Sequence, residues 1–418
     1  MKHRFIPPRP VMAMAAALCL ISLLPMAAAD TPSAGGDPVN DVEALQQQFE
    51  QYNQQIQQDY QTEAGNIEEA YQKYQQMIEE EYRAYERRIL AVWLEAEIST
   101  KKRWVEYSDD MKTRQVVDFD SGEIRIDMVL PEGATDQAEA MFQEKLRQLI
   151  QESQQTAYSR DDLAQRIEER LKELDEYVKT APVPETPIMT RVVTGKSDPS
   201  PAEIRQAATD LRQRASVSRR PARDDNSRVV SFRTSLPPAS IQRKALDYKN
   251  DVSRFAGQHG LQEPLVFAIM HTESAFNPMA RSHVPAYGLM QIVPRSGGRD
   301  ASKLIFGEEK LLSPSFLYNE TNNINTGTAY LHLLYYRYLK AVADPTSRIY
   351  CAISAYNTGP GNVARAFTGS TNVARAAAVI NRMTPDQVYH HLQRNLPYQE
   401  TRHYLQRVVQ RMDTYHSL

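Results

Sequence analysis

The longest regular pattern in the chain is an apolar stripe between Val42 and Trp93. Apolar and aromatic side chains recur mostly three or four residues apart there, and Gln and Glu fill the positions between them. This period predicts one long amphipathic helix, which no proline interrupts and in which Gly65 is the weak point. Two packings suit such a stripe: the helix packs on its own domain, or it forms a coiled coil with a partner.

A hairpin and further helices are predicted after the long helix. Residues 114–119 and 124–128 alternate between apolar and polar side chains, and Asp120-Ser121-Gly122 between them has turn chemistry. From about Thr135 to Thr180 the apolar positions return to helical spacing. Together with the long helix, these elements predict an α+β N-terminal domain over residues 30–180.

Prolines set the next segment apart. Eight of them occur between Ala181 and Ser240, with Ser and Arg among them. This composition predicts a linker over residues 181–240, which carries a short helix at 202–214 and a strand at 229–232.

From Ile241 to Leu418 the pattern is helical. Gly- and Pro-containing stretches at 274–298 and 357–361 interrupt it, and functional side chains tend to lie on such loops when a rigid scaffold holds them. The chain is therefore predicted to be mainly α: a long helix and a small α+β N-terminal domain precede a helical domain over residues 241–418. The helices predicted in that domain span 241–259, 264–273, 322–342, 347–356, 372–381, 385–395 and 400–415.

The first residues have the features of a secretory signal. Basic residues precede an apolar run from Val11 to Met26 that is short for a membrane span, and three alanines follow it. We expect a signal peptide over residues 1–29 and a periplasmic mature protein; an uncleaved membrane anchor is the alternative. A lipid on Cys19 would make it an outer-membrane lipoprotein, but bulky Leu18 precedes Cys19 where a small residue is expected.

Charge is unevenly divided along the chain. Residues 30–190 hold 17 basic and 35 acidic side chains, a net charge of −18, whereas residues 241–418 hold 19 and 12, a net charge of +7. A cationic C-terminal domain favours an anionic polymer, and both peptidoglycan and nucleic acid have that charge. A secretory signal argues against nucleic acid, so no nucleic-acid partner is expected.

One carboxylate stands at the end of an apolar helix. The run from Leu265 leads to Glu273, and the chain then turns at Asn277-Pro278. Partial burial would raise the pKa of this carboxyl toward the range of a general acid. A lone Glu at a helix end is also often a solvated or capping group. His271 lies two residues away, and helical geometry turns the two side chains apart, which argues against a shared metal ion.

Three later segments carry side chains that suit a sugar site. Residues 286–292 contain a glycine, an apolar pair and a glutamine, and residues 355–361 end a helix with Tyr and Asn before two glycines. Residues 396–402 open the last helix and present Tyr398, with Tyr404 further along it. Flat aromatic faces and amide dipoles are the groups that bind sugar rings, hydroxyls and acetamido groups.

These segments form four motifs in order: E-S-x-x-N-P, G-L-M-Q, A-Y-N-x-G-P-G and Y-x-E-T-R-x-Y. Together they closely resemble the soluble lytic transglycosylase domain, over roughly residues 240–418. Upstream, the stretch W-V-E-Y-S-D-D-M-K-T-R-Q-V-V-D-F from Trp104 resembles the leading domain of the membrane-bound murein transglycosylase C family. The likeness is therefore nearly full length.

The resemblance implies a lysozyme-like, mostly helical fold with a glycan groove. Glu273 falls on the family's catalytic acid, and Tyr404 falls on a tyrosine that supports the reaction. Glu400 and Arg402 match motif positions that we interpret as structural. The expected substrate contacts are residues of the same motifs or of the loop between them: Ser274, Ser282, Gly288, Met290, Gln291, Tyr356, Asn357 and Tyr398.

A single well-placed carboxylate implies a particular reaction. Ordinary glycosidases use two carboxylates. We hypothesise instead that Glu273 protonates the bond between N-acetylmuramic acid and N-acetylglucosamine, and then deprotonates the muramoyl C6 hydroxyl so that a 1,6-anhydro ring closes. Such a lyase needs no metal and no cofactor. A lysozyme-type hydrolase and a non-catalytic peptidoglycan-binding scaffold are the alternatives. The N-terminal domain is a candidate binding region for cell-wall machinery proteins.

Overall fold

The computed structural model describes residues 38–283, 285–416 and 418. The chain divides into two compact units, Met1–Thr62 and Glu63–Leu418, and the candidate site lies in the second. Helix α2 (Pro38–Val92) confirms the long helix predicted from the apolar stripe. The predicted signal peptide, with Cys19, lies outside the described residues.

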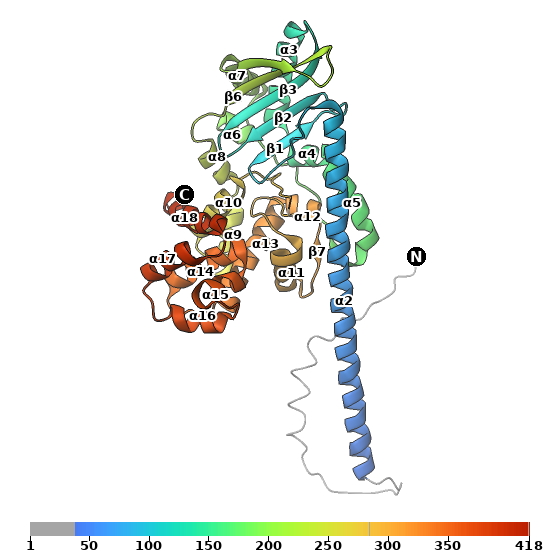
Figure 1. The fold of residues 1–418 in the computed structure, drawn as a ribbon, viewed down its shortest axis with the longest axis vertical. Coiled ribbons are helices and arrows are strands. Elements are labelled where there is room, and N and C mark those ends of the chain that lie inside the picture. The colour runs from blue at the N-terminus through green and yellow to red at the C-terminus, as the bar shows by residue number, and fades with distance from the viewer. Residues whose placement is uncertain (1–37, 284, 417) are drawn as a thin grey trace. The chain divides into compact units, whose positions relative to one another are not determined.

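Within the second unit, α2 packs on its own chain. Apolar residues of the stripe are buried from Ile67 onward, and three tyrosine hydroxyls on it donate hydrogen bonds to the C-terminal half, among them that of Tyr74 to the Tyr287 hydroxyl (3.2 Å). Tyr71 bonds the Lys310 carbonyl (3.0 Å) and Tyr82 bonds the Ser282 carbonyl (3.4 Å). Helix α5 (Asp162–Leu171) runs beside this part of α2 (Figure 1). Over these residues, the packing within the same chain is the one observed.

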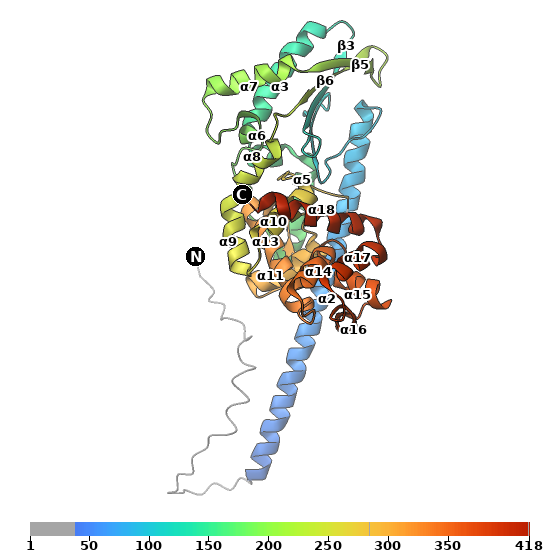
Figure 2. The same cartoon turned by 90° about the vertical axis from the view of Figure 1, so that its left-hand side faces the viewer.

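An antiparallel five-stranded sheet follows α2. The predicted hairpin is confirmed as β2 (Thr113–Asp118) and β3 (Glu123–Pro131), joined by a turn in which Gly122 has a φ of 69°. Helices α3 (Thr135–Gln151) and α7 (Pro201–Gln213) cover one face (Figure 2), where Phe142 stacks on Phe232 with 4.4 Å between ring centroids. The strand order is β1-β2-β3-β6-β5, with β1 (Arg103–Tyr107), β5 (Ser216–Pro221) and β6 (Ser227–Ser235).

The prediction of a linker over residues 181–240 is wrong. The segment contains α6 (Thr190–Thr194), α7, β5 and β6, and β6 pairs with β3 from Ser227 to Ser235. The short helix and the strand expected inside it are present, but the strand is longer and internal to the sheet. Its prolines stand where folded structure accepts them: Pro201 begins α7 and Pro221 ends the edge strand β5. The other domain boundaries stay predictions.

Short elements connect the sheet to the helical domain. Helix α4 (Gln154–Arg160), α5 and the 3₁₀ segment η1 (Lys172–Tyr177) lead to β4 (Val178–Lys179). Strand β4 pairs in parallel with β7 (Leu311–Leu312) of the helical domain. The N-terminal elements are therefore joined to the helical domain by backbone pairing as well as by side chains.

The helical domain confirms the mainly α class. All seven predicted helices are present, some divided or extended, and α11, α12 and α15 are additional. Among the described residues, no helix is both long and apolar enough to cross a membrane. The elements are α8 (Ser240–Asp247), α9 (Lys249–His259), α10 (Glu263–Ser274), η2 (Pro294–Gly298), α11 (Arg299–Phe306), α12 (Pro314–Tyr318), α13 (Glu320–His332), η3 (Leu333–Tyr338), α14 (Pro345–Thr358), α15 (Pro360–Thr368), α16 (Val373–Ile380), α17 (Pro385–Asn395) and α18 (Gln399–Tyr415).

Helix α10 is the centre of this domain. All its residues from Leu265 to Ser274 except His271 are buried, so its sequence is an apolar run rather than an amphipathic stripe. Helices α9 and α18 pack against it, and Phe267 stacks on Tyr415 of α18 with 5.4 Å between ring centroids. A helix buried on all sides places its own end inside the fold.

A buried ion pair joins the loop after α10 to α5. Arg281 Nη1 lies 3.0 and 2.8 Å from the two carboxylate oxygens of Asp161, and the Arg281 side chain is 2% exposed. Asp161 also accepts a hydrogen bond from the Ala164 N–H and so caps α5. One carboxylate therefore serves both a helix cap and an interdomain contact.

Asp161→Ala is expected to lower the free energy of unfolding by about 3–5 kcal/mol, because it leaves a buried guanidinium unpaired and removes a cap. The matched control is Asp162→Ala. Asp162 pairs with Arg88 of α2 and with Arg166 (3.0 Å), where all three side chains are 38–52% exposed, and such pairs contribute about 0–1 kcal/mol each. Urea unfolding followed by circular dichroism measures both variants. Equal losses would contradict the importance of the buried pair.

Candidate active site

Glu273 stands near the C-terminal end of α10, where the helix stops abruptly. Ala275 and Phe276 have φ angles of 51° and 62°, a conformation that is unfavourable for residues other than glycine. Packing holds them there, since Phe276 is fully buried against the rings of Tyr248 and His271. This strained turn fixes the direction of the chain just after the Glu273 carboxylate.

The Glu273 carboxylate is buried, with 6% of the side chain exposed. Burial is the largest influence on its pKa and raises it above the ordinary range. Lys101, with Nζ 3.6 Å from Oε2, opposes this effect, and so does Tyr404. The negative charge of Glu400 adds to the effect of burial. A carboxyl with a raised pKa suits general acid catalysis near neutral pH.

Tyr404 reaches the site from α18. Its side chain is buried, and its hydroxyl makes no hydrogen bond of standard geometry within the described residues. The hydroxyl nevertheless lies near enough to Glu273 to lower the pKa of that carboxyl. Burial and then the Glu273 charge raise the pKa of both Tyr404 and Tyr356. The structure thus brings these two predicted site residues to Glu273.

Further along the loop after α10, Gly288 (φ 72°) and Gln291 (φ 49°) also have the left-handed conformation. The Gly288 N–H donates to the Ala280 carbonyl (2.8 Å). The Ser274 hydroxyl lies 2.8 Å from the Leu289 carbonyl. The first contact closes the loop on itself, and the second fastens it to the end of α10.

Asn323 on α13 holds the same loop from another side. Its side-chain amide donates to the carbonyls of Tyr287 and Leu317, both at 2.8 Å, and its oxygen accepts from the Met290 N–H at 2.8 Å. Asn323 is buried, so these bonds are shielded from water. Sequence analysis missed this residue, because an asparagine among polar neighbours in a helix gives no signal of burial.

Tyr356 and Asn357, near the end of α14, brace the site. The Tyr356 hydroxyl donates to the Met290 carbonyl (2.8 Å), and Asn357 Oδ1 accepts from the Thr401 hydroxyl (2.7 Å) on α18. Hydrogen bonds thus join three motifs that are far apart in the sequence. The polar atoms expected to contact a glycan are here bonded to protein, so the observed role of Tyr356 and Asn357 is to hold the walls of the site.

The remaining predicted residues differ in what they present. Gln291 Nε2 donates to the Gly288 carbonyl (3.1 Å), and its Oε1 is buried without a hydrogen-bond partner among the described residues. Tyr398 is 55% exposed at the start of α18. Ser282 is half-buried, and its carbonyl accepts from Tyr82 of α2. Tyr398 therefore offers an exposed ring to a ligand, whereas Gln291 Oε1 is buried, and Ser282 also donates its N–H to the Ala286 carbonyl (3.1 Å).

Lys101 was not among the predicted site residues. It lies between α2 and β1, and the run Lys101-Lys102-Arg103 has the pattern of a solvated basic turn. The structural interpretation of Glu400 is wrong, because its side chain is 71% exposed and its carboxylate lies 3.9 Å from Lys101 Nζ. Arg402 does have a structural role, since its Nε donates to the Leu396 carbonyl (2.7 Å).

His271 belongs to the packing of α10. Its Nδ1 lies 2.9 Å from the Tyr415 hydroxyl, and burial lowers its pKa to about 3, so the ring is neutral. In the described part of the chain, no group of three or more His, Cys, Asp or Glu side chains is placed to hold a metal ion.

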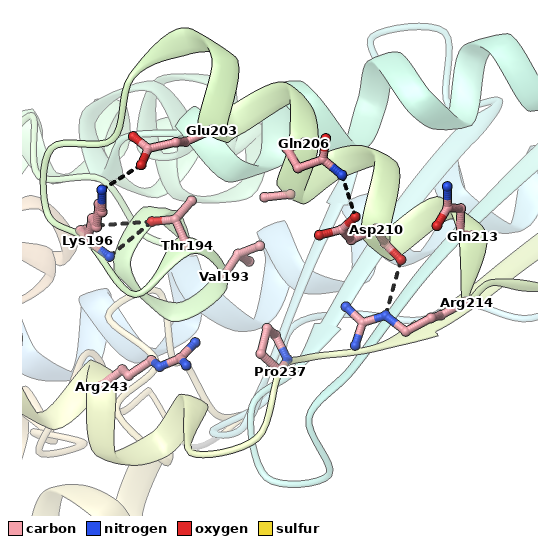
Figure 3. A pocket seen from close by; sticks show the side chains of 11 residues that line it. Val193, Thr194, Lys196, Glu203, Gln206, Asp210, Gln213, Arg214, Pro237 and Arg243 are labelled. Atoms are coloured by element: carbon pink, nitrogen blue, oxygen red, sulfur yellow. Dashed lines mark hydrogen bonds and ion pairs between the residues drawn. The ribbon is translucent and has the colours of Figure 1, made fainter.

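A cavity of about 640 Å³ lies in the sheet region, lined by α6, α7 and their neighbours (Figure 3). Several of its polar groups are bonded to protein: Lys196 to Glu203 (2.5 Å), and Arg214 to the Asp210 carbonyl (3.1 Å). None of the candidate site residues lines it. This cavity is therefore separate from the candidate active site.

Two family models match the chain. Residues 252–379 match the Transglycosylase SLT domain, and residues 71–154 match the Membrane-bound lytic murein transglycosylase C, N-terminal domain. The first range contains Glu273, Gln291 and Asn357 but ends before α18, and the second contains Lys101.

Relatives extend the likeness over most of the chain. "Membrane-bound lytic murein transglycosylase C" of Sodalis glossinidius (strain morsitans) is 35% identical over 315 residues, which cover 75% of this chain and 82% of that protein. The chain belongs to the membrane-bound lytic murein transglycosylase C family. The family member of Klebsiella pneumoniae subsp. pneumoniae is also 35% identical, over 322 residues. A solved structure, the 70 kDa soluble lytic transglycosylase SLT70 of Escherichia coli, has a TM-score of 0.33 at 22% identity and covers 67% of this chain and 43% of its own, too little to support an argument.

Gly288 is expected to tolerate no side chain. A Cβ there would overlap the Asn323 side chain and lie 2.5 Å from the Leu317 carbonyl oxygen. Gly288→Ala should therefore lower the free energy of unfolding by about 1–3 kcal/mol beyond the backbone effect, and lower activity as the loop shifts. Gly369→Ala isolates the backbone effect of about 1–2 kcal/mol, because Gly369 has a φ of 68° and nothing within 4 Å of its Cβ position. Urea unfolding compares the two, and equal losses would contradict the close fit at Gly288.

Proposed function

We propose that this protein is a lytic transglycosylase that cleaves peptidoglycan between N-acetylmuramic acid and N-acetylglucosamine, with Glu273 as its single acid/base. The observation that carries the proposal is the Glu273 carboxyl, which is buried at the end of α10 and has a pKa raised by that burial. The name of the relatives, lytic murein transglycosylase, states the same class of reaction and the same polymer.

The reaction has two proton transfers, and Glu273 takes part in both. Glu273 first donates its proton to the glycosidic oxygen, so the bond from that oxygen to the muramoyl C1 breaks and the N-acetylglucosamine side leaves as an alcohol. The carbonyl oxygen of the 2-acetamido group on the same muramoyl ring bonds to C1. The ionised Glu273 then takes the proton of the C6 hydroxyl, whose oxygen attacks C1 and displaces the acetamido oxygen. The 1,6-anhydro ring is closed, Glu273 has its proton again, and no water is consumed.

The surroundings of Glu273 support ring closure over hydrolysis. The carboxyl and the neighbouring Tyr404 are both buried, and exclusion of water favours attack by a hydroxyl of the substrate. The Tyr404 hydroxyl and Gln291 Oε1 are buried polar atoms without a standard hydrogen bond, which suits contact with sugar hydroxyl and acetamido groups. The exposed Tyr398 ring suits stacking on a sugar face.

The other predicted contacts have a supporting role in this proposal. Their side chains or backbone hold the loop after α10 and the end of α14 around Glu273, so they shape the walls within which a glycan strand would lie. These residues are Ser274, Gly288, Met290, Tyr356 and Asn357. A contact of Ser282 with the substrate stays a prediction.

A cell-envelope location follows from the proposed substrate and from the relatives, which are named membrane-bound. Cleavage of a signal peptide, a lipid on Cys19 and binding of cell-wall machinery proteins by the N-terminal region stay predictions. No residue set in the described part of the chain calls for a metal, and the proposed chemistry uses none.

A lysozyme-type hydrolase is the second candidate function, because Glu400 shares Lys101 with Glu273 and is a second carboxylate near the acid. Such an enzyme would use Glu400 to activate water on the other side of the sugar.

The product of the reaction separates the two candidates. Digestion of purified peptidoglycan by the protein should release muropeptides one water lighter than hydrolytic products, because the C6 hydroxyl takes the place of water. Mass spectrometry of the products measures this. Reducing-end products would establish the hydrolase, and the absence of any product would favour the peptidoglycan-binding scaffold.

Glu273→Gln is expected to reduce cleavage by at least about 10²–10⁴-fold, because glutamine can neither donate nor accept the transferred proton. The matched control is Glu263→Gln at the opposite end of α10, which should cleave at the wild-type rate. Release of soluble product from peptidoglycan gives the rates.

A hydrolase that depends on Glu400 would also lose its activity in Glu400→Gln, whereas the transglycosylase would still form anhydro products. Substantial cleavage by Glu273→Gln would contradict the proposed function.

A further inference from the structure

Lys101 brings a positive charge to Glu273 from outside the helical domain. It lies in the turn between α2 and β1, and its Nζ is 3.6 Å from Glu273 Oε2 and 3.9 Å from Glu400 Oε1. The Lys101 side chain is 39% exposed, whereas that of Glu273 is 6% exposed. The ammonium group therefore stands between a buried carboxylate and water.

The backbone around Lys101 is held by the loop that follows Glu273. The Lys101 carbonyl accepts from Asn277 Nδ2, and the Thr100 carbonyl accepts from the Arg281 N–H, both at 3.5 Å. Lys102, the next residue, pairs with Asp120 in the β2–β3 turn (2.6 Å). These contacts tie the turn to the helical domain on one side and to the sheet on the other, so the Lys101 backbone is fixed relative to α10.

The charged and titratable groups around Glu273 come from three places. Helix α18 supplies the Glu400 carboxylate and the Tyr404 hydroxyl, and α14 supplies the Tyr356 hydroxyl. The turn before β1 supplies Lys101. Among these described neighbours, Lys101 is the cation, and its charge is the one that favours an ionised Glu273 most.

We propose that Lys101 is a positioning residue for the acid/base: it orients the Glu273 carboxylate and stabilises its ionised form between the two proton transfers. This inference rests on the proposed function, since it assigns Lys101 a role only if Glu273 cycles between its two protonation states. It also means that the N-terminal part of the chain supplies part of the active site. A helical domain alone would have the acid without the cation that offsets its burial.

The direction of the pH effect follows from the charges. Cleavage begins with protonated Glu273, so kcat/KM falls as the pH rises through the pKa of this carboxyl. Removing the lysine charge raises that pKa further, because an adjacent cation favours the ionised form. The descending limb of the pH profile should therefore move to higher pH.

The test compares Lys101→Met, Lys101→Arg and Lys102→Met in the full chain, with purified glycan strands as the substrate. In Lys101→Met the descending limb should move up by about one pH unit, and kcat should fall by about tenfold with KM little changed. In Lys101→Arg the descending limb of the pH profile should stay where it is in the wild type, because arginine keeps the positive charge beside Glu273. Lys102→Met is the matched control, since Lys102 pairs with Asp120 instead, and its limb should not move.

Three outcomes would overturn the inference. They are an unmoved limb in Lys101→Met, an equal shift in Lys102→Met, and a shift in Lys101→Arg as large as that in Lys101→Met. At a pH low enough to protonate Glu273, the thermal unfolding midpoint of Lys101→Met should equal that of the wild type, because the lysine then has no charge to stabilise. Lys101→Gln repeats the measurement if it does not. Loss of cleavage in Glu273→Gln together with an unmoved limb overturns the role of Lys101 alone, whereas retained cleavage in Glu273→Gln overturns the proposed function and this inference with it.

Discussion

The removal of the Glu273 carboxyl from water is the constraint on which the rest of the site depends. A carboxyl can be buried at a helix end only if the helix itself is buried, and α10 meets this condition by being apolar on every side. The helix must also end at once, which the left-handed Ala275 and Phe276 achieve at a cost in backbone strain. Helix α18 places Tyr404 beside Glu273, and the positive charge of Lys101 favours the ionised form of the Glu273 carboxyl.

The N-terminal part of the chain takes part in the fold of the helical domain. Besides the Arg281–Asp161 pair, Arg295 and Arg299 of the helical domain both bond Glu68 of α2, at 2.7 and 3.1 Å. Ion pairs within the molecule thus neutralise part of the negative charge of the N-terminal region and part of the positive charge of the C-terminal domain. The net charge of +7 overstates the field that the C-terminal domain presents to an anionic polymer.

Sequence reasoning succeeded where a local pattern carries the information. The 3.6-residue period of α2, the β2–β3 turn and the periodic helices of the helical domain are all local, and so are the motifs around Glu273 and Tyr356. Sequence reasoning failed at contacts between residues that are far apart in the sequence. Lys101 and Asn323 look like ordinary polar residues in their own segments, and only the fold brings them to Glu273 and Met290. A strand was predicted at 229–232, but its place inside the sheet was not, because its pairing with β3 spans about a hundred residues of chain.

That separation has a consequence for how the molecule is made. As the chain is synthesised, the hairpin of β2 and β3 keeps an unpaired edge until β6 has emerged, and Tyr71 of α2 lacks its acceptor in the folded protein until Lys310 has emerged. Contacts between residues so distant in sequence slow folding and leave apolar surface and strand edges open to aggregation in the meantime. The first half of the chain therefore cannot complete its native contacts until the second half has been synthesised, and the two halves reach their final structure together.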